Sequence, residues 1–97
     1  MGAYEFETVA SGNTVEDAFD GARSDAQWEH GHGGYTGTIA EKHSFVIVSP
    51  VPLSTDEAYE LADNLLYADA DISDKWGPAG AIPIDTGEWL FFGYASS

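Results

Sequence analysis

The first residues of the chain alternate between apolar and acidic side chains. Tyr4 and Phe6 fall on one side of this alternation, and Glu5 and Glu7 fall on the other. A period of two is typical of a strand with one face buried and the other in water. The pattern therefore predicts a strand over residues 3–10.

The next segment has the spacing of an amphipathic helix. Asn13 supplies an N-cap with Glu16 three residues on, and apolar side chains then recur every three or four residues. This predicts a helix of about 15 residues that ends at Gly31. Its core-facing positions are Val15, Ala18, Phe19, Ala22 and Ala26.

A second helix is predicted after Pro50 and Pro52. Residues 54–57, Ser-Thr-Asp-Glu, form a capping box, in which the serine and the glutamate each accept a hydrogen bond from the other's backbone N–H. The core-facing positions that follow are Ala58, Leu61, Ala62, Leu65 and Leu66.

The remaining apolar segments predict strands. Residues 38–49 are apolar and β-branched toward their end, which predicts a central strand buried on both faces there. Residues 81–84 and 88–94 flank Asp85-Thr86-Gly87, and this arrangement predicts a hairpin with a glycine in its three-residue turn. Because Pro83 cannot donate to a ladder, the first arm is expected at a sheet edge or at a bulge.

These elements predict a single α+β domain over residues 1–97. We expect two helices packed on one face of a mostly antiparallel sheet of about four strands. The expected order along the chain is strand, helix, strand, helix, strand, strand.

Charge is the strongest compositional signal, because 17 acidic residues stand against 3 lysines and arginines, a formal net charge of −14. Nucleic acids and anionic membranes are bound through clusters of lysine and arginine, so neither is an expected partner. Two explanations of the acidity stay open. Solubility in concentrated salt fits acids spread along the chain, whereas mimicry of DNA phosphates requires them on one face.

Few signs of catalysis are present. The chain has no cysteine and no hydrolase, metalloprotease or phosphate-loop motif, so we expect a non-enzymatic protein without a cofactor. His30, His32 and His43 lack the spacing of helical metal ligands, and no metal site is predicted. Neither a signal peptide nor an apolar run of membrane-spanning length is recognised, which favours the cytoplasm.

A glycine-dense segment, residues 31–37, is one candidate ligand site. Its backbone N–H groups could hold an anion such as a nucleotide phosphate, with a nearby lysine and tyrosine adding charge and a stacking face. The glycines follow a helix instead of preceding one, so an ordinary turn is the alternative. The candidate residues are His32, Gly33, Gly34, Tyr35, Thr36, Gly37 and Lys42.

Aromatic side chains gather in the last quarter of the chain. Both faces of the second hairpin arm are apolar, so helices on only one face of the sheet would leave an aromatic row exposed for a protein partner or a second copy of the chain. Burial on both sides is the alternative. The candidate interaction residues are Trp76, Trp89, Phe91, Phe92 and Tyr94.

Residues 32–42, 74–80 and 89–93 resemble small proteins of unknown function from actinobacterial phages and from viruses or prophages of haloarchaea. The resemblance implies a viral or mobile-element protein in the cytoplasm of a halophilic host. The expected function is that of an accessory protein that binds a protein partner, or itself as a homodimer, through the aromatic hairpin. A ligand-binding module at the glycine-dense segment and an acidic DNA mimic are the alternatives.

Overall fold

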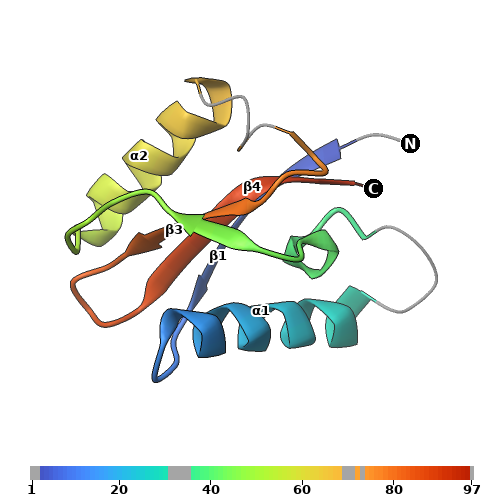
Figure 1. Cartoon of the computed structure of the whole chain (residues 1–97), viewed down its shortest axis with the longest axis horizontal. Helices are drawn as coiled ribbons and strands as arrows, with labels where there is room; N and C mark the ends of the chain where they lie inside the picture. The colour runs from blue at the N-terminus through green and yellow to red at the C-terminus, as the bar shows by residue number, and fades with distance from the viewer. Residues whose placement is uncertain (1–2, 31–35, 69–71, 73, 97) are drawn as a thin grey trace.

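A four-stranded sheet lies between two helices in the computed structural model, which describes residues 3–30, 36–68, 72 and 74–96 (Figure 1). This confirms the α+β class and the expected order of helices and strands. The elements are β1 (Ala3–Ala10), α1 (Val15–His30), the 3-10 turn η1 (Ile39–Glu41), β2 (Phe45–Ile47), α2 (Thr55–Ala68), β3 (Ala79–Pro83) and β4 (Trp89–Ser96).

The strands lie in the order β1-β4-β3-β2. β4 pairs antiparallel with both β1 and β3, whereas β2 pairs parallel with β3. The β3–β4 hairpin is as predicted, and its turn is closed by the Ile84 N–H donating to the Glu88 carbonyl at 2.9 Å. α2 makes the crossover that parallel β2 and β3 require.

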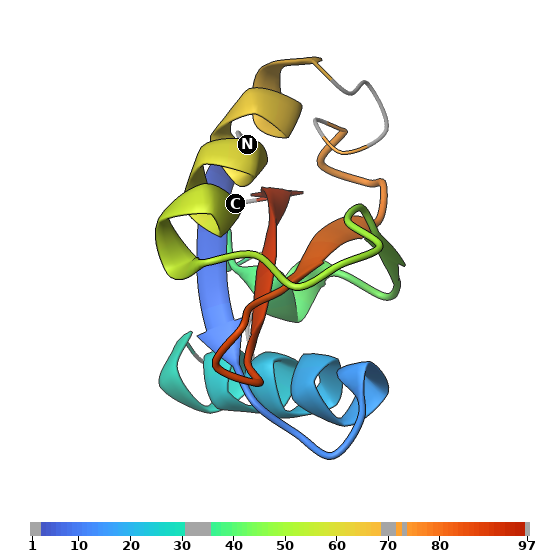
Figure 2. The same cartoon turned by 90° about the vertical axis from the view of Figure 1, so that its left-hand side faces the viewer.

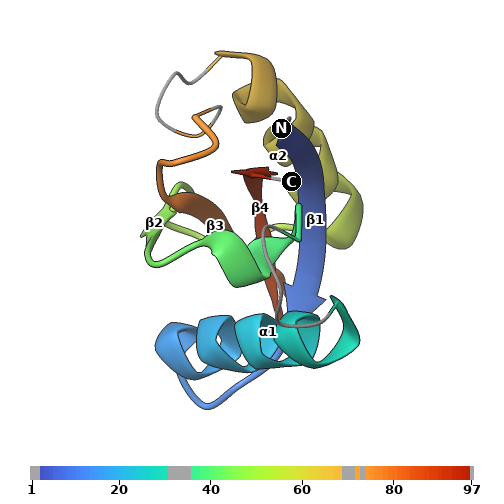
Figure 3. The ribbon, with the colours of Figure 1, turned by 90° about the vertical axis from the view of Figure 1, so that its right-hand side faces the viewer.

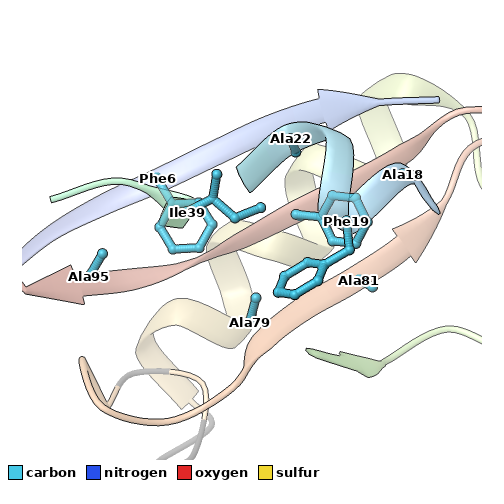
Figure 4. Packing of buried hydrophobic residues seen from close by; sticks show 9 residues of the cluster. Phe6, Ala18, Phe19, Ala22, Ile39, Ala79, Ala81 and Ala95 are labelled. Carbon is cyan, nitrogen blue, oxygen red and sulfur yellow. The ribbon is translucent and has the colours of Figure 1, made fainter. Parts of the chain in front are cut away.

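The helices cover opposite faces of the sheet, so the expectation that they share one face is wrong (Figure 2). Phe91 of β4 packs with α1, in the cluster that also holds Phe6 and Phe19 (Figure 4). Leu90 and Phe92 pack with α2. Because alternate side chains of a strand point to opposite faces, two apolar rows on β4 require a cover on each side.

The expected central strand over residues 38–49 is also wrong. η1 takes up its start, since the Thr38 hydroxyl accepts a hydrogen bond from the Ala40 N–H at 3.2 Å. Only the short β2 follows, at the edge of the sheet, with Val46 and Ile47 exposed. β3 is an interior strand instead of an edge, and Pro83 is tolerated at its last position.

Local capping explains where both helices begin. The Asp17 N–H donates to the Thr14 hydroxyl at 3.1 Å, so α1 is capped one residue after the expected Asn13. The predicted box of α2 is confirmed: Ser54 N–H donates to Glu57 Oε1, and Glu57 N–H donates to Ser54 Oγ, both at 3.2 Å. Each cap satisfies backbone donors that have no partner within the helix.

Close packing of β3 against β4 yields a test at Gly80. This residue pairs with Phe92, and a Cβ added to it would overlap the Phe92 ring. We expect Gly80→Ala to lower the free energy of unfolding by about 1–3 kcal/mol, measured by urea denaturation. Gly21→Ala is the control, because an added Cβ there meets no heavy atom within 4 Å and a helix gains about 0.5–1 kcal/mol from the change. Equal stability of the Gly80→Ala variant and the parent would contradict this packing.

Candidate functional site

The aromatic candidates at the hairpin do not form an exposed row. Phe91 and Phe92 are fully buried, and Trp89 and Tyr94 are half-buried. Trp76 alone of the candidate set is exposed, at 63 %. The expectation is wrong for Phe91 and Phe92 because helices on both faces of the sheet enclose both rows of β4.

The glycine-dense segment is described only from its end onward, and His32, Gly33, Gly34 and Tyr35 lie outside the described residues. Thr36 donates to Glu41 Oε2 from its backbone N–H at 3.0 Å and from its hydroxyl at 2.9 Å. The Gly37 N–H donates to the Ser96 carbonyl at 2.7 Å. The N–H groups of Thr36 and Gly37 and the Thr36 hydroxyl are thus already hydrogen-bonded within the chain and are not free to bind an anion.

Lys42 is buried and links its own segment to residues 74–77 by hydrogen bonds, instead of facing a ligand. The side chain is 1 % exposed, and Nζ donates to the carbonyls of Asp74 at 3.2 Å, Lys75 at 3.3 Å and Gly77 at 2.9 Å. Burial lowers the pKa of Lys42, and the charge of Asp74 opposes part of this effect. The expectation that Lys42 binds a phosphate is therefore wrong, because the side chain is buried and its ammonium group already donates to three backbone carbonyls.

A cleft of about 700 Å³ lies between β1 and α1. Its lining includes five carboxylate residues and neither lysine nor arginine. The carboxylates belong to Glu5, Glu7, Asp25, Glu29 and Glu88. We call this the acidic cleft, and it is the strongest candidate site among the described residues.

The acidic cleft runs along the free edge of β1. Residues 5–11 all line it without a gap. Side chains of a strand alternate between the two faces, so an unbroken run of lining residues shows that the cleft reaches the edge of β1. The lining residues Phe6, Ala22 and Ile39 place the rest of the cleft on the face of the sheet that α1 covers. The C-terminal end of α1 extends past β1 (Figure 3). Asp25, Ala26 and Glu29 of this part of α1 line the cleft on its second side.

A carboxyl pair lies at this edge. Glu7 is hydrogen-bonded to Asp63 of α2, and burial, this bond and the charges of Asp63 and Glu5 raise the Glu7 pKa to about 7. Near neutral pH Glu7 is therefore partly protonated, because the ionised form is desolvated by burial and repelled by the charges of Asp63 and Glu5.

The sequence analysis did not predict the acidic cleft, although the spacing of two pairs of acidic residues indicated part of it. Glu5 and Glu7 are two apart on a strand and so share a face. Asp25 and Glu29 are four apart on a helix and so share a side. What the sequence could not supply is that α1 crosses the sheet next to β1 and brings the two pairs to one cleft.

The alternative of DNA mimicry finds little support in the described residues. Acidic residues lie on both helices, with Asp20 and Asp25 on α1 and Glu60 and Asp63 on α2. These helices cover opposite faces of the sheet, whereas DNA mimicry requires one acidic face.

The described part of the chain contains no group of three or more side chains placed to hold a metal ion. It also contains no helix long and apolar enough to cross a membrane.

The contribution of the Lys42 hydrogen bonds to stability is testable by Lys42→Met. This variant keeps the apolar stem but leaves three carbonyls without their donor, and we expect it to lower the free energy of unfolding by about 1–3 kcal/mol. Lys75→Met is the control, because the Lys75 Nζ lies 5.4 Å from the centre of the exposed Trp76 ring and its loss costs at most about 1 kcal/mol. Chemical denaturation measures the free energy of unfolding of both variants. Equal losses of stability would contradict a structural role of the Lys42 hydrogen bonds.

The carboxyl pair predicts a pH dependence of stability. The Glu7 pKa is about 7 in the folded chain against an ordinary value of 4.5, so between these values the folded chain holds a proton that the unfolded chain has lost. The resulting stabilisation is complete below the lower value and disappears as pH rises through about 7. We expect Glu7→Gln to lose this pH dependence, followed by denaturation from about pH 5 to about pH 8. Glu60→Gln, which removes an equal charge from an exposed position of α2, should keep it. Identical curves for Glu7→Gln and the parent would exclude the raised pKa of Glu7.

Comparison of the chain with models of protein families, with curated proteins and with solved structures finds no match. The resemblance to phage and haloarchaeal virus proteins therefore stays a prediction. What the protein does has to be inferred from the chemistry of the acidic cleft.

Proposed function

We propose that the protein is a non-enzymatic interaction module that binds a cationic segment of a partner protein in the acidic cleft. The observation that carries this proposal is the composition of the lining, in which five carboxylate residues and no lysine or arginine surround a space of about 700 Å³. A cleft lined by charges of one sign concentrates the electric field and attracts the opposite charge.

The sign of the charge argues against two other occupants. An anionic ligand would add to a formal net charge of −14 and meet carboxylates on both walls. A second copy joined edge to edge at β1 would bring Glu5 and Glu7 close to the same acids of its partner, and like charges on adjacent strands repel each other. A lysine- or arginine-containing segment meets neither penalty.

Binding of this kind depends on salt. At ~1 M salt the Debye length falls to about 3 Å, so only charges in contact still attract each other. If the host is a halophile, as the resemblance implies, carboxylates around the acidic cleft then select the partner, and apolar and backbone contacts supply more of the affinity.

The test uses a fluorescein-labelled peptide of alternating lysine and valine with blocked ends, as long as β1, eight residues. Its affinity is measured by anisotropy at about 0.1 M and about 1 M KCl, with circular dichroism to check that the fold is intact. We expect binding that weakens with salt, and a loss of roughly three- to tenfold when Glu5→Gln and Asp25→Asn are combined.

The matched control combines Glu60→Gln with Asp20→Asn. It changes the net charge by the same amount with the same residue types, but neither Glu60 nor Asp20 lines the acidic cleft. We expect the control to bind within about twofold of the parent. An equal loss in both double variants would mean that the peptide responds to net charge alone, and the proposal would be wrong.

A further inference from the structure

We infer that the cationic segment binds as a fifth strand of the sheet, paired through its backbone with the free edge of β1. This inference rests on the proposed function and specifies how the partner is held. β1 is eight residues long and lies at one end of the strand order, so only one of its two edges is occupied, by β4. An extended peptide that joins such an edge gains affinity from main-chain hydrogen bonds.

The direction of the backbone groups follows from the hairpin. Ile84 and Glu88 form the first hydrogen-bonded pair next to the turn. In an antiparallel ladder, hydrogen-bonded and non-hydrogen-bonded pairs alternate, so Leu90 and Phe92 of β4 turn their backbone groups toward β3. In agreement, the Ala81 carbonyl points the other way, where it accepts from the Val48 N–H at 3.0 Å.

The same alternation continues into β1. Phe91 and Gly93 of β4 turn their backbone groups toward β1, where they lie opposite Thr8 and Phe6. The residues between these pairs in β1 therefore turn their N–H and C=O groups away from β4 and toward the acidic cleft. These residues are Glu5, Glu7 and Val9.

These outward groups have no backbone partner elsewhere in the part of the chain that the structure describes. Open donors and acceptors on an edge strand are a template for pairing with another strand. The acidic cleft thus places unpaired backbone groups and carboxylates along one line, and an extended cationic segment satisfies both.

α1 covers one face of the position that a fifth strand would take. Two small side chains of α1, Ala22 and Ala26, line the acidic cleft. The exposed Trp28 is three residues from Asp25 and so lies on the same side of α1. On the other face a fifth strand has Glu5 and Glu7 beside it. A segment with lysines on one face and small apolar residues on the other matches this arrangement.

The first experiment uses two N-methylated forms of the lysine–valine peptide, one methylated on every lysine and the other on every valine. Charge and composition are the same, but in an added strand only one of the two sets of N–H groups bonds β1. We expect the affinities of the two peptides to differ by about tenfold or more in the anisotropy measurement. Equal affinities would overturn the fifth strand and leave the proposed function standing, whereas no binding by any peptide would overturn the proposed function and this inference with it.

A second experiment changes the protein. Proline at position 9 removes an N–H that points to the acidic cleft, and proline is tolerated on an edge strand where the N–H faces outward. Val9→Ala is the reference, because it removes the branched valine side chain but keeps the N–H. We expect Val9→Pro to bind the unmethylated peptide about tenfold more weakly than Val9→Ala. Equal binding by the two folded variants would contradict the inference, and the peptide comparison decides it if Val9→Pro does not fold.

Discussion

Burial of β4 on both faces is the constraint on which the rest of the structure depends. Leu90 and Phe92 point to α2, while Phe91 points to α1, with its ring centre 5.4 Å from that of Phe19. A strand with two apolar rows cannot lie at an edge or under one layer of helices, since the hydrophobic effect favours removing both rows from water. β4 is therefore interior, and β1 is left with one side open.

The sequence was sufficient for elements that local chemistry defines and insufficient for those set by distant contacts. The capping box at Ser54 and the glycine turn before β4 depend on residues a few positions apart, and both were predicted. The face on which each helix packs depends on the whole sheet, and an apolar stripe does not specify it. Lys42 was misread for the same reason, because its three acceptors lie more than 30 residues along the chain.

The acidic cleft was beyond reach of the sequence for a related reason. Within each segment its acidic residues have the pattern of ordinary surface residues, and nothing in the sequence distinguishes them from the other acids among the 17 of the chain. Only the crossing of α1 over the edge of β1 distinguishes Asp25 and Glu29 from the other acids of that helix. In the proposed function, charge determines which segments approach, and the backbone of β1 determines the conformation in which they are held.

The two ends of the sheet differ in a way that limits assembly. β2 has three residues and is followed by Pro50, whereas β1 presents eight residues in an unbroken line. A sheet that can lengthen from both sides can polymerise, but one with a single usable side accepts one strand and stops. If a strand pairs with β1, the short β2 leaves little edge for another one, and the complex would remain a discrete one-to-one particle instead of growing into a fibre.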